Sequence, residues 1–281
     1  MESIVSRQCW RTLEPVHAHV YFAPEALEEY AALGYDVAGN HAAGYFPARA
    51  AAMGAVNAGV VQATFFNFSC VAAVFGMDRA WEIATPAQVL AARYRAADRA
   101  LRRMCGDLLD APEVLEAVEL ARTATSGCHP EGRPLFAANA SLDWPEVPHL
   151  ALFHAVTLLR EFRGDGHIAA LVVEGISGLE AALMHVAQGD SWTREPLRKT
   201  RGYTTEEWDA AAAGLRARGW LDDADVFTAE GAAVRQRVED RTDVLALPAW
   251  QALGIDGATR LRELVRPLST AILEAGGLRI R

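Results

Sequence analysis

The sequence predicts a mainly α-helical fold. Alanine is frequent throughout the 281 residues, and the alternation of apolar and polar residues that marks strands is rare. Hydrophobic residues make up 51% of the chain and charged residues 22%, so the chain can bury a large core. Helix signals recur: Pro24 opens a segment that ends at Gly34, and Thr85, Ser177 and Thr204 stand where helix N-caps are expected.

The order of these segments predicts three regions. Residues 1–125 form a helical domain, and residues 126–148 form an irregular connector with four prolines beside short apolar patches. Residues 149–281 begin with a periodic helix that is expected to break at the turn-forming sequence GDG, residues 164–166, and then to restart. A short helix, a capped helix, a two-stranded ribbon over residues 221–227 and a further helix are expected to follow.

The composition limits the compartment and the partners. No apolar run approaches the roughly 18 residues of a membrane span, and the start of the chain lacks the pattern of a signal peptide. The four cysteines are scattered without a CxxC pair, as expected for reduced thiols in a cytoplasmic protein. The net charge of -9 lacks the basic excess that phosphate binding usually requires, so nucleic acid is the less favoured partner.

The segment over residues 178–241 resembles the winged helix of MarR-type regulators. Its predicted order is helix, short helix, helix, ribbon, helix, and it contains the phrase LRARGWLDDADVFTAEGAAVRQRVE. The matching positions are Leu215, Arg218, Gly219, residues 221–227 as a wing, Thr228 and Gly231. The resemblance implies a MarR-like winged-helix C-terminal part beside the helical N-terminal part.

Nearly the whole chain also resembles a poorly characterised actinobacterial family described as helix-turn-helix. The stretches that carry this resemblance are HAHVYF, YFPARAAAMGAV, GRPLFAANA, LREFRGDGH and EDRTD. The resemblance implies a fold and a kinship, and it brings no activity with it.

The surface that would meet DNA in a winged helix is acidic in this sequence. The recognition helix would open with Glu206, Glu207 and Asp209, and the wing tip carries Asp222, Asp223 and Asp225. Carboxylates there oppose phosphate charge. The one basic cluster precedes the helix and contains Arg194, Arg198, Lys199 and Arg201. It is interpreted as a solvated loop, or, if the protein is a regulator, as the loop that touches DNA. The sequence therefore favours a winged helix whose nucleic-acid face has been lost.

A dense group of charged residues between apolar runs is the first candidate site. Glu161 shares a helix face with His154, Asp165 is expected to cap the restarting helix, and His167 would then lie in its first turn. There the helix dipole would favour neutral imidazole, so His167 could act as a general base oriented by Asp165 or Glu161, with Arg163 holding an anionic group. The structural alternative is that these side chains only cap, pair or satisfy a buried carbonyl group.

Two further sets of residues could bind a small molecule or an ion. An apolar pocket with polar anchors is expected from Tyr45, Arg49, Phe66, Asn67 and His17, although aromatic residues more often form core. Three histidines could form a metal site, His17, His154 and His167, with Glu14 or Glu161 as an oxygen ligand. Neither HExxH nor CxxCH is present, so no cofactor is predicted, and metal or haem binding remains the third hypothesis.

Three functions follow in order of preference. The first is a small-molecule enzyme or binding protein that performs non-redox acid/base chemistry on a ligand with an anionic group. The second is a ligand-responsive winged-helix transcription regulator, and the third is a metal or haem protein. The Rossmann, P-loop and nucleophile-elbow motifs are absent. An apolar tail over residues 260–278 could pack within the chain or support a homodimer.

Overall fold

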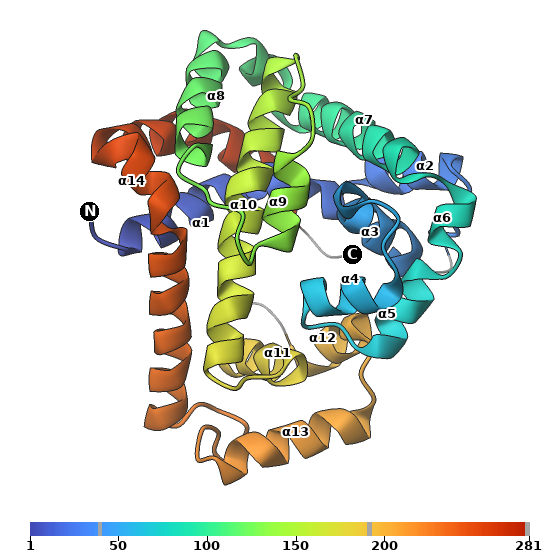
Figure 1. Cartoon of the computed structure of the whole chain (residues 1–281), viewed down its shortest axis with the longest axis vertical. Helices are drawn as coiled ribbons and strands as arrows, with labels where there is room; N and C mark the ends of the chain where they lie inside the picture. The colour runs from blue at the N-terminus through green and yellow to red at the C-terminus, as the bar shows by residue number, and fades with distance from the viewer. Residues whose placement is uncertain (39–40, 190–192, 279–281) are drawn as a thin grey trace.

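The structure is a computed structural model that describes residues 1–38, 41–189 and 193–278 (Figure 1). The α-helices are α1 (Ile4–Ala18), α2 (Pro24–Ala32), α3 (His41–Ala50), α4 (Ala58–Phe65), α5 (Cys70–Met77), α6 (Ala80–Ile83), α7 (Pro86–Cys105), α8 (Pro112–Thr125), α9 (Pro134–Ala140), α10 (Pro148–Val173), α11 (Gly178–Ala187), α12 (Arg194–Arg201), α13 (Thr205–Ala217) and α14 (Ala229–Glu274). Three 3₁₀ helices are η1 (His19–Tyr21), η2 (Ala51–Met53) and η3 (Gly106–Asp110). Within the described ranges the β structure is a single bridge between Leu221 and Phe227. The prediction of a mainly α fold is confirmed.

Local capping chemistry starts several helices where the sequence predicted a start. Capping boxes pair Thr85 with Gln88, Ser177 with Glu180, and Thr204 with Glu207. In each box the hydroxyl accepts a backbone N–H and the longer side chain accepts the N–H of the capping residue. Each cap contributes roughly 1 kcal/mol, so these helix starts are set before tertiary packing is considered.

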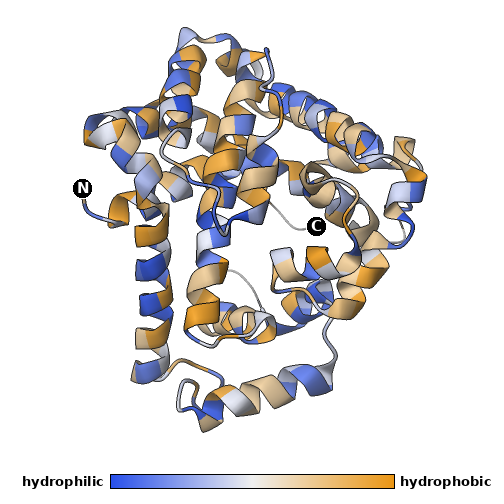
Figure 2. Cartoon of the chain, viewed as in Figure 1, coloured by the Kyte–Doolittle hydropathy of each residue, from blue (hydrophilic) through white to orange (hydrophobic). Residues whose placement is uncertain are grey.

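The central helix α10 is continuous through the sequence at which a break was predicted, so that prediction is wrong. Gly164 and Gly166 lie inside α10 and leave room for charged side chains. A Cβ atom on Gly166 would lie 2.8 Å from Nη1 of Arg133, whose guanidinium donates to the carbonyls of Phe162 and, at 2.8 Å, of Leu245. This packing outweighs the roughly 1 kcal/mol that a glycine costs in a helix. Figure 2 shows polar residues about halfway along an otherwise largely apolar α10.

Two hydrophobic cores share α10 and α14. The first core collects residues of α1, α2, α7, α8, the first half of α10 and the last part of α14. The second core joins the end of α10 to α11, α12, α13 and the first part of α14. The predicted connector over residues 126–148 contains the helix α9, so it is irregular only in part. The predicted domain boundaries themselves stay a prediction.

The C-terminal tail packs within the chain. α14 kinks at Gly254, whose φ of 80° and ψ of 163° are not helical, and the helix then turns back across α1 and α8 (Figure 1). Leu261, Val265 and Ile272 are fully buried in the first core. The apolar pattern of the tail is therefore explained by this core, and a homodimer stays a prediction.

Within the described ranges no single helix is long and apolar enough to cross a bilayer. α10 and α11 reach the required length and composition only as a pair, and their axes are bent by 100° relative to each other.

Replacing Gly166 by alanine should destabilise the protein more than replacing Gly164. The methyl group at Gly166 would push Arg133 away from two carbonyls, so we expect the free energy of unfolding to fall by about 1–3 kcal/mol. At Gly164 the nearest atom, 3.3 Å from the added carbon, is the end of the Arg160 side chain, and a gain of roughly 1 kcal/mol in helix propensity offsets the crowding. Urea denaturation of Gly166→Ala and Gly164→Ala measures the difference, and equal loss in both would contradict this account.

Candidate functional site

A cavity of about 260 Å³ lies between the two cores, where α10 faces the α4–α5 loop on one side and α11 and α12 on the other. Its volume is near the lower end of the roughly 300–1,000 Å³ that small-molecule sites occupy. Of the residues that the sequence proposed, its wall includes Tyr45, Arg49, Phe66, Asn67, Glu161, Asp165 and His167. The structure thus brings together residues from three separate stretches of the chain.

Glu161 is the charged anchor of this wall. Its side chain is 1% exposed and pairs with Arg49 at 3.2 Å and with Arg160 at 2.7 Å. Burial would raise the pKa of Glu161, but the two guanidinium groups outweigh burial and hold the pKa well below its usual range. Arg49 also stacks 4.4 Å from the ring centre of Phe65. Glu161 is therefore an ionised partner that fixes Arg49 in place.

Asp165 caps a neighbouring helix instead of its own. It lies in the interior of α10, and its Oδ2 accepts the backbone N–H of Phe136 in the first turn of α9 at 3.0 Å. The prediction that it starts a new helix is wrong because α10 does not break. The carboxyl is 4% exposed, and its burial raises the pKa of Asp165 to about 6 although the N–H of Phe136 opposes that shift.

His167 is also an interior residue of α10, so the predicted effect of a helix terminus on it is wrong. Its Nδ1 lies 2.9 Å from the hydroxyl of Thr242, which donates its own hydrogen to the carbonyl of Val238. Nδ1 therefore carries the proton, and Nε2 is left as an acceptor. Burial, with repulsion from nearby guanidinium groups, lowers the pKa of His167 to about 4, so the ring is neutral.

His17 does not reach the cavity. Its Nδ1 donates to Thr157, whose hydroxyl hydrogen goes to the carbonyl of Phe153, and its Nε2 accepts from the hydroxyl of Tyr21 at 3.0 Å. Both ring nitrogens are thus used inside the first core. Burial holds the pKa of His17 well below its usual range. The prediction that His17 contacts a ligand is wrong for this geometry.

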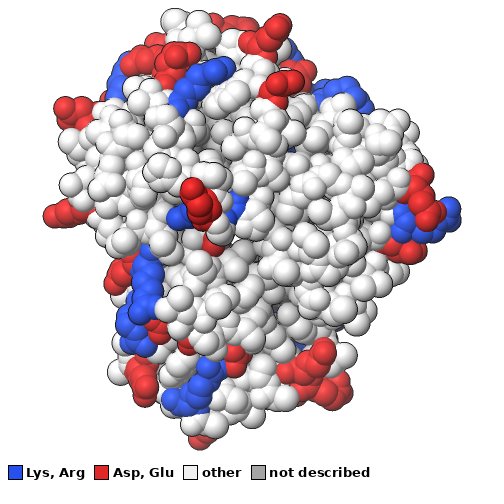
Figure 3. Space-filling model, in the orientation of Figure 1, with Lys and Arg blue, Asp and Glu red and all other residues white. Residues whose placement is uncertain are grey.

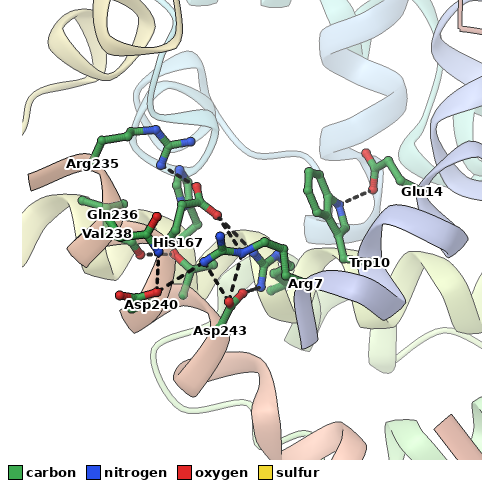
Figure 4. A network of polar contacts seen from close by, with 12 residues as sticks. Arg7, Trp10, Glu14, His167, Arg235, Gln236, Val238, Asp240 and Asp243 are labelled. Carbon is green, nitrogen blue, oxygen red and sulfur yellow. Dashed lines mark hydrogen bonds and ion pairs between the residues drawn. The ribbon is translucent and has the colours of Figure 1, made fainter. Parts of the chain in front are cut away.

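Arg163 belongs to a buried polar network and is not part of the cavity wall. Figure 4 shows this network around Arg7 and Asp243. It donates to Oδ1 of Asp243 at 2.8 Å and pairs with Glu239 at 3.4 Å, while Arg7 approaches the other oxygen of Asp243 to 2.8 Å. Asp243 is 1% exposed, and a buried carboxylate left without partners would strongly destabilise the fold. Arg163 therefore fastens α1, α10 and α14 together, and the prediction that it holds an anionic ligand is wrong.

The predicted three-histidine metal site does not form. His154 is buried against Trp144, and its Nδ1 lies 2.7 Å from the hydroxyl of Tyr94. Burial lowers the pKa of His154 to about 4. In the described part of the chain, no three His, Cys, Asp or Glu side chains come together in a way that could hold a metal ion.

Arg201 is the main cavity residue that the sequence interpretation missed. The segment interpreted as a solvated basic loop is the helix α12, and Arg201 lines the cavity with its guanidinium 4.4 Å from the ring centre of Phe68. Burial lowers the pKa of Arg201 below its usual range. The signal was the spacing of four from Leu197, because residues four apart share a helix face and Leu197 is buried in the second core.

α12 and α13 meet at a tight turn beside the cavity. Gly202 ends α12 in the left-handed conformation, with φ 75° and ψ 29°, and Thr204 caps α13 two residues later. Trp208 and Leu215 of α13 are buried together with Leu197 of α12. The opposite face of α13 is exposed. A helix, a short turn with glycine, and a second helix with one free face constitute the helix-turn-helix arrangement.

This arrangement defines the class of the protein as helix-turn-helix. The comparison with known families agrees: residues 6–279 match a family described as a helix-turn-helix family, and the chain belongs to that family. No curated protein and no solved structure matches the chain. The predicted kinship with helix-turn-helix proteins is thus confirmed at this level.

Family membership corrects two expectations. A helix-turn-helix family that covers nearly the whole chain indicates a DNA-binding regulator, so the interpretation of the chain as a small-molecule enzyme or simple binding protein is wrong. The expectation that nucleic acid is an unlikely partner is wrong for the same reason. It rested on the net charge of the whole molecule and on the carboxylates of the expected recognition helix and wing. The catalytic roles assigned to Glu161, Asp165 and His167 are untested by the comparison.

Asp165 should make the stability of the protein depend on pH. Its folded pKa of about 6 lies above the roughly 3.9 of an unfolded aspartate, so the folded state binds the proton more tightly. Stability is then greatest below about pH 4 and falls as the pH rises to about 6, by on the order of 2–3 kcal/mol relative to Asp165→Asn. The amide keeps an acceptor for the N–H of Phe136 but does not titrate.

Urea denaturation of wild type and Asp165→Asn between pH 4 and 8 measures this difference. Asp107→Asn, which removes one carboxylate at an exposed position, controls for the change in net charge. Parallel pH profiles for wild type and Asp165→Asn would contradict the assignment.

Proposed function

We propose that the protein is a ligand-responsive winged-helix transcription regulator that acts in the cytoplasm. In this proposal α12, α13 and the hairpin over residues 221–227 bind DNA, and the cavity binds a small effector. The observation that carries the proposal is the extent of the family match. Residues 6–279 include both the helix-turn-helix unit and every described wall of the cavity.

The junction of α13, the hairpin and α14 supports a wing. Thr228 accepts the N–H of Gly231 at 3.1 Å and donates to the carbonyl of Gly219 at 2.6 Å. Gly219 has a φ of 72°, and Gly231 has no room for a side chain against the carbonyl of Trp220. These are the positions that resemble MarR-type regulators, and their contacts hold a short hairpin between two helices.

The carboxylates of this surface have local partners, which weakens the electrostatic objection to DNA binding. Asp209 on α13 pairs with Arg194, and Asp225 in the hairpin pairs with Arg216. Asp222 accepts two backbone N–H groups of its own hairpin, at 2.9 and 3.0 Å. Such pairs reduce the repulsion that each carboxylate would exert on phosphate.

The charge of the unit is nevertheless balanced and not basic. Residues 194–227 contain six basic and seven acidic side chains. On the face shown in Figure 3, blue and red groups are interspersed along the edge formed by α13 and the lower part of α14. A surface of this kind makes few phosphate contacts, so base-edge contacts must supply most of the specificity.

An effector bound in the cavity would contact the helix-turn-helix unit directly. Leu197 and Arg201 of α12 and Met184 and His185 of α11 belong to its wall. Tyr45, Phe65 and the α4–α5 loop form the opposite side. A ligand between them would therefore bias how the unit sits against the helical part, which is what an effector of a regulator must do.

The affinity for DNA should depend only weakly on salt concentration, and Lys199 should account for part of that dependence. A duplex selected from a random-sequence library should bind with a slope of log K against log salt of about -2 to -4, since few phosphates are contacted. Lys199 is exposed on α12, the helix that crosses the DNA backbone in this geometry. Lys199→Ala should weaken binding and reduce the slope by about 1.

Titrations by fluorescence anisotropy at several salt concentrations measure both quantities, with Lys199→Arg as the charge-preserving control. Failure of the wild-type protein to enrich any duplex, or to bind one at low salt, would overturn the proposed function.

A further inference from the structure

The loop between α4 and α5 touches the cavity and the helix-turn-helix unit at the same time. Phe66, Asn67 and Phe68 line the cavity. Ser69 follows them directly and caps α5, because its hydroxyl accepts the N–H of Ala72 at 3.0 Å. A ligand that displaced these three residues would therefore also change the position of Ser69.

Ser69 makes two hydrogen bonds to the turn of the helix-turn-helix unit. Its N–H donates to the carbonyl of Arg201 at 2.9 Å, and its hydroxyl donates to the carbonyl of Gly202 at 2.7 Å. Ser69 is 5% exposed, so water cannot readily replace either hydrogen bond. These bonds join the N-terminal helical part to the end of α12.

Backbone packing makes the same junction close. A Cβ atom on Gly202 would lie 2.6 Å from the Cβ of Ala72 and 2.8 Å from Oγ of Ser69. At the other end of the loop the carbonyl of Phe66 lies against Gly178, the first residue of α11, and leaves no room for a side chain there. The loop thus contacts the start of α11 and the end of α12.

The loop begins in a strained turn. Phe66 has φ 62° and ψ -56°, and the N–H of Asn67 donates to the carbonyl of Phe65 at 2.7 Å. This is the classic γ-turn, which is rare because the backbone is strained for a residue with a side chain. Strain of this kind persists only where surrounding contacts hold it, so losing the contacts at Gly178 or Gly202 favours a different loop conformation.

We propose that Ser69 clamps the α12–α13 turn to the helical part, and that the α4–α5 loop transmits occupancy of the cavity to this clamp. The clamped state is the one described here, and a bound ligand that moves Phe66 or Asn67 opens it and frees the orientation of α13. This inference rests on the proposed function for its biological meaning. Its structural claim can be tested without DNA.

Three substitutions at Ser69 separate the clamp from the helix cap. Ser69→Ala loses the cap and the hydroxyl bond to Gly202, Ser69→Asp keeps an acceptor for the cap but has no hydrogen to donate to Gly202, and Ser69→Thr keeps both. The backbone bond from Ser69 to the carbonyl of Arg201 is present in all three variants, so they test the hydroxyl part of the clamp. In hydrogen exchange, we expect residues 198–206 to lose protection at least tenfold in Ser69→Ala and Ser69→Asp and to be unchanged in Ser69→Thr. Unchanged protection in α7 shows that the effect is local. Equal protection in all three variants would overturn the clamp.

Two glycines provide a matched test of the close contact. Gly202 and Gly189 both end helices with positive φ, 75° and 80°, but an added Cβ meets Ala72 and Ser69 only at Gly202. Gly189→Ala therefore measures backbone strain alone. Gly202→Ala should deprotect residues 198–206 several-fold more than Gly189→Ala deprotects residues 184–189 at the end of its own helix, and equal effects would contradict the clamp.

Occupancy of the cavity can be imitated by Ala181→Phe, because Ala181 lies on the cavity wall. We expect this variant to deprotect residues 198–206 at least threefold in the wild-type background and to add nothing in Ser69→Ala. No effect in the wild-type background, or the same fold-change in both, would overturn transmission through Ser69.

The final measurement is the affinity for a duplex selected with the wild-type protein. Transmission to DNA predicts that Ser69→Ala and Ala181→Phe shift this affinity in the same direction by at least threefold, while Ser69→Thr does not. If the exchange results hold but no duplex is ever selected, the proposed function fails and the clamp stands. If DNA binds and Ser69→Ala and Ala181→Phe leave its affinity unchanged, the transmission to DNA fails alone.

Discussion

The buried carboxylate of Glu161 is the constraint on which the arrangement around the cavity depends. A carboxylate at 1% exposure must be paired, and removing one partner of a buried pair typically costs about 3–5 kcal/mol. Arg49 supplies the pair from α3 and stacks on Phe65 at the end of α4. The pairing of Glu161 with Arg49 therefore positions α3, α4 and the loop that follows α4. These elements form one wall of the cavity.

The other polar residues of α10 extend the same logic to the rest of the fold. Arg163 binds α1 and α14 through Asp243, Asp165 caps α9, and His167 holds Thr242 of α14. Together with Glu161, these residues join α10 to α1, α3, α9 and α14. α10 belongs to both hydrophobic cores, so these contacts also set how the helical part and the helix-turn-helix unit share an interface.

What could be predicted from the sequence was what local chemistry determines. The caps at Thr85, Ser177 and Thr204 and the helical periodicity are short-range signals, and they gave the helix starts and the mainly α class. The continuity of α10 through GDG could not be predicted, because the reason is Arg133, which is about thirty residues away in sequence and fills the space that glycine leaves. Seven candidate residues line the cavity, whereas His17 and Arg163 bind other buried side chains. Their partners, Thr157 and Asp243, are distant in sequence, so the spacing of residues could not separate the two groups.

The balanced charge of the helix-turn-helix unit, first taken as an argument against DNA binding, is consistent with tight control by an effector. Electrostatic attraction to phosphate is insensitive to small changes in orientation, and it supplies most of non-specific affinity. A unit with few unpaired cations depends on base-edge contacts, which need accurate placement of α13. A contact that fixes the α12–α13 turn, such as the one made by Ser69, then has a large influence on affinity, because little non-specific attraction remains to hold a misplaced helix on DNA.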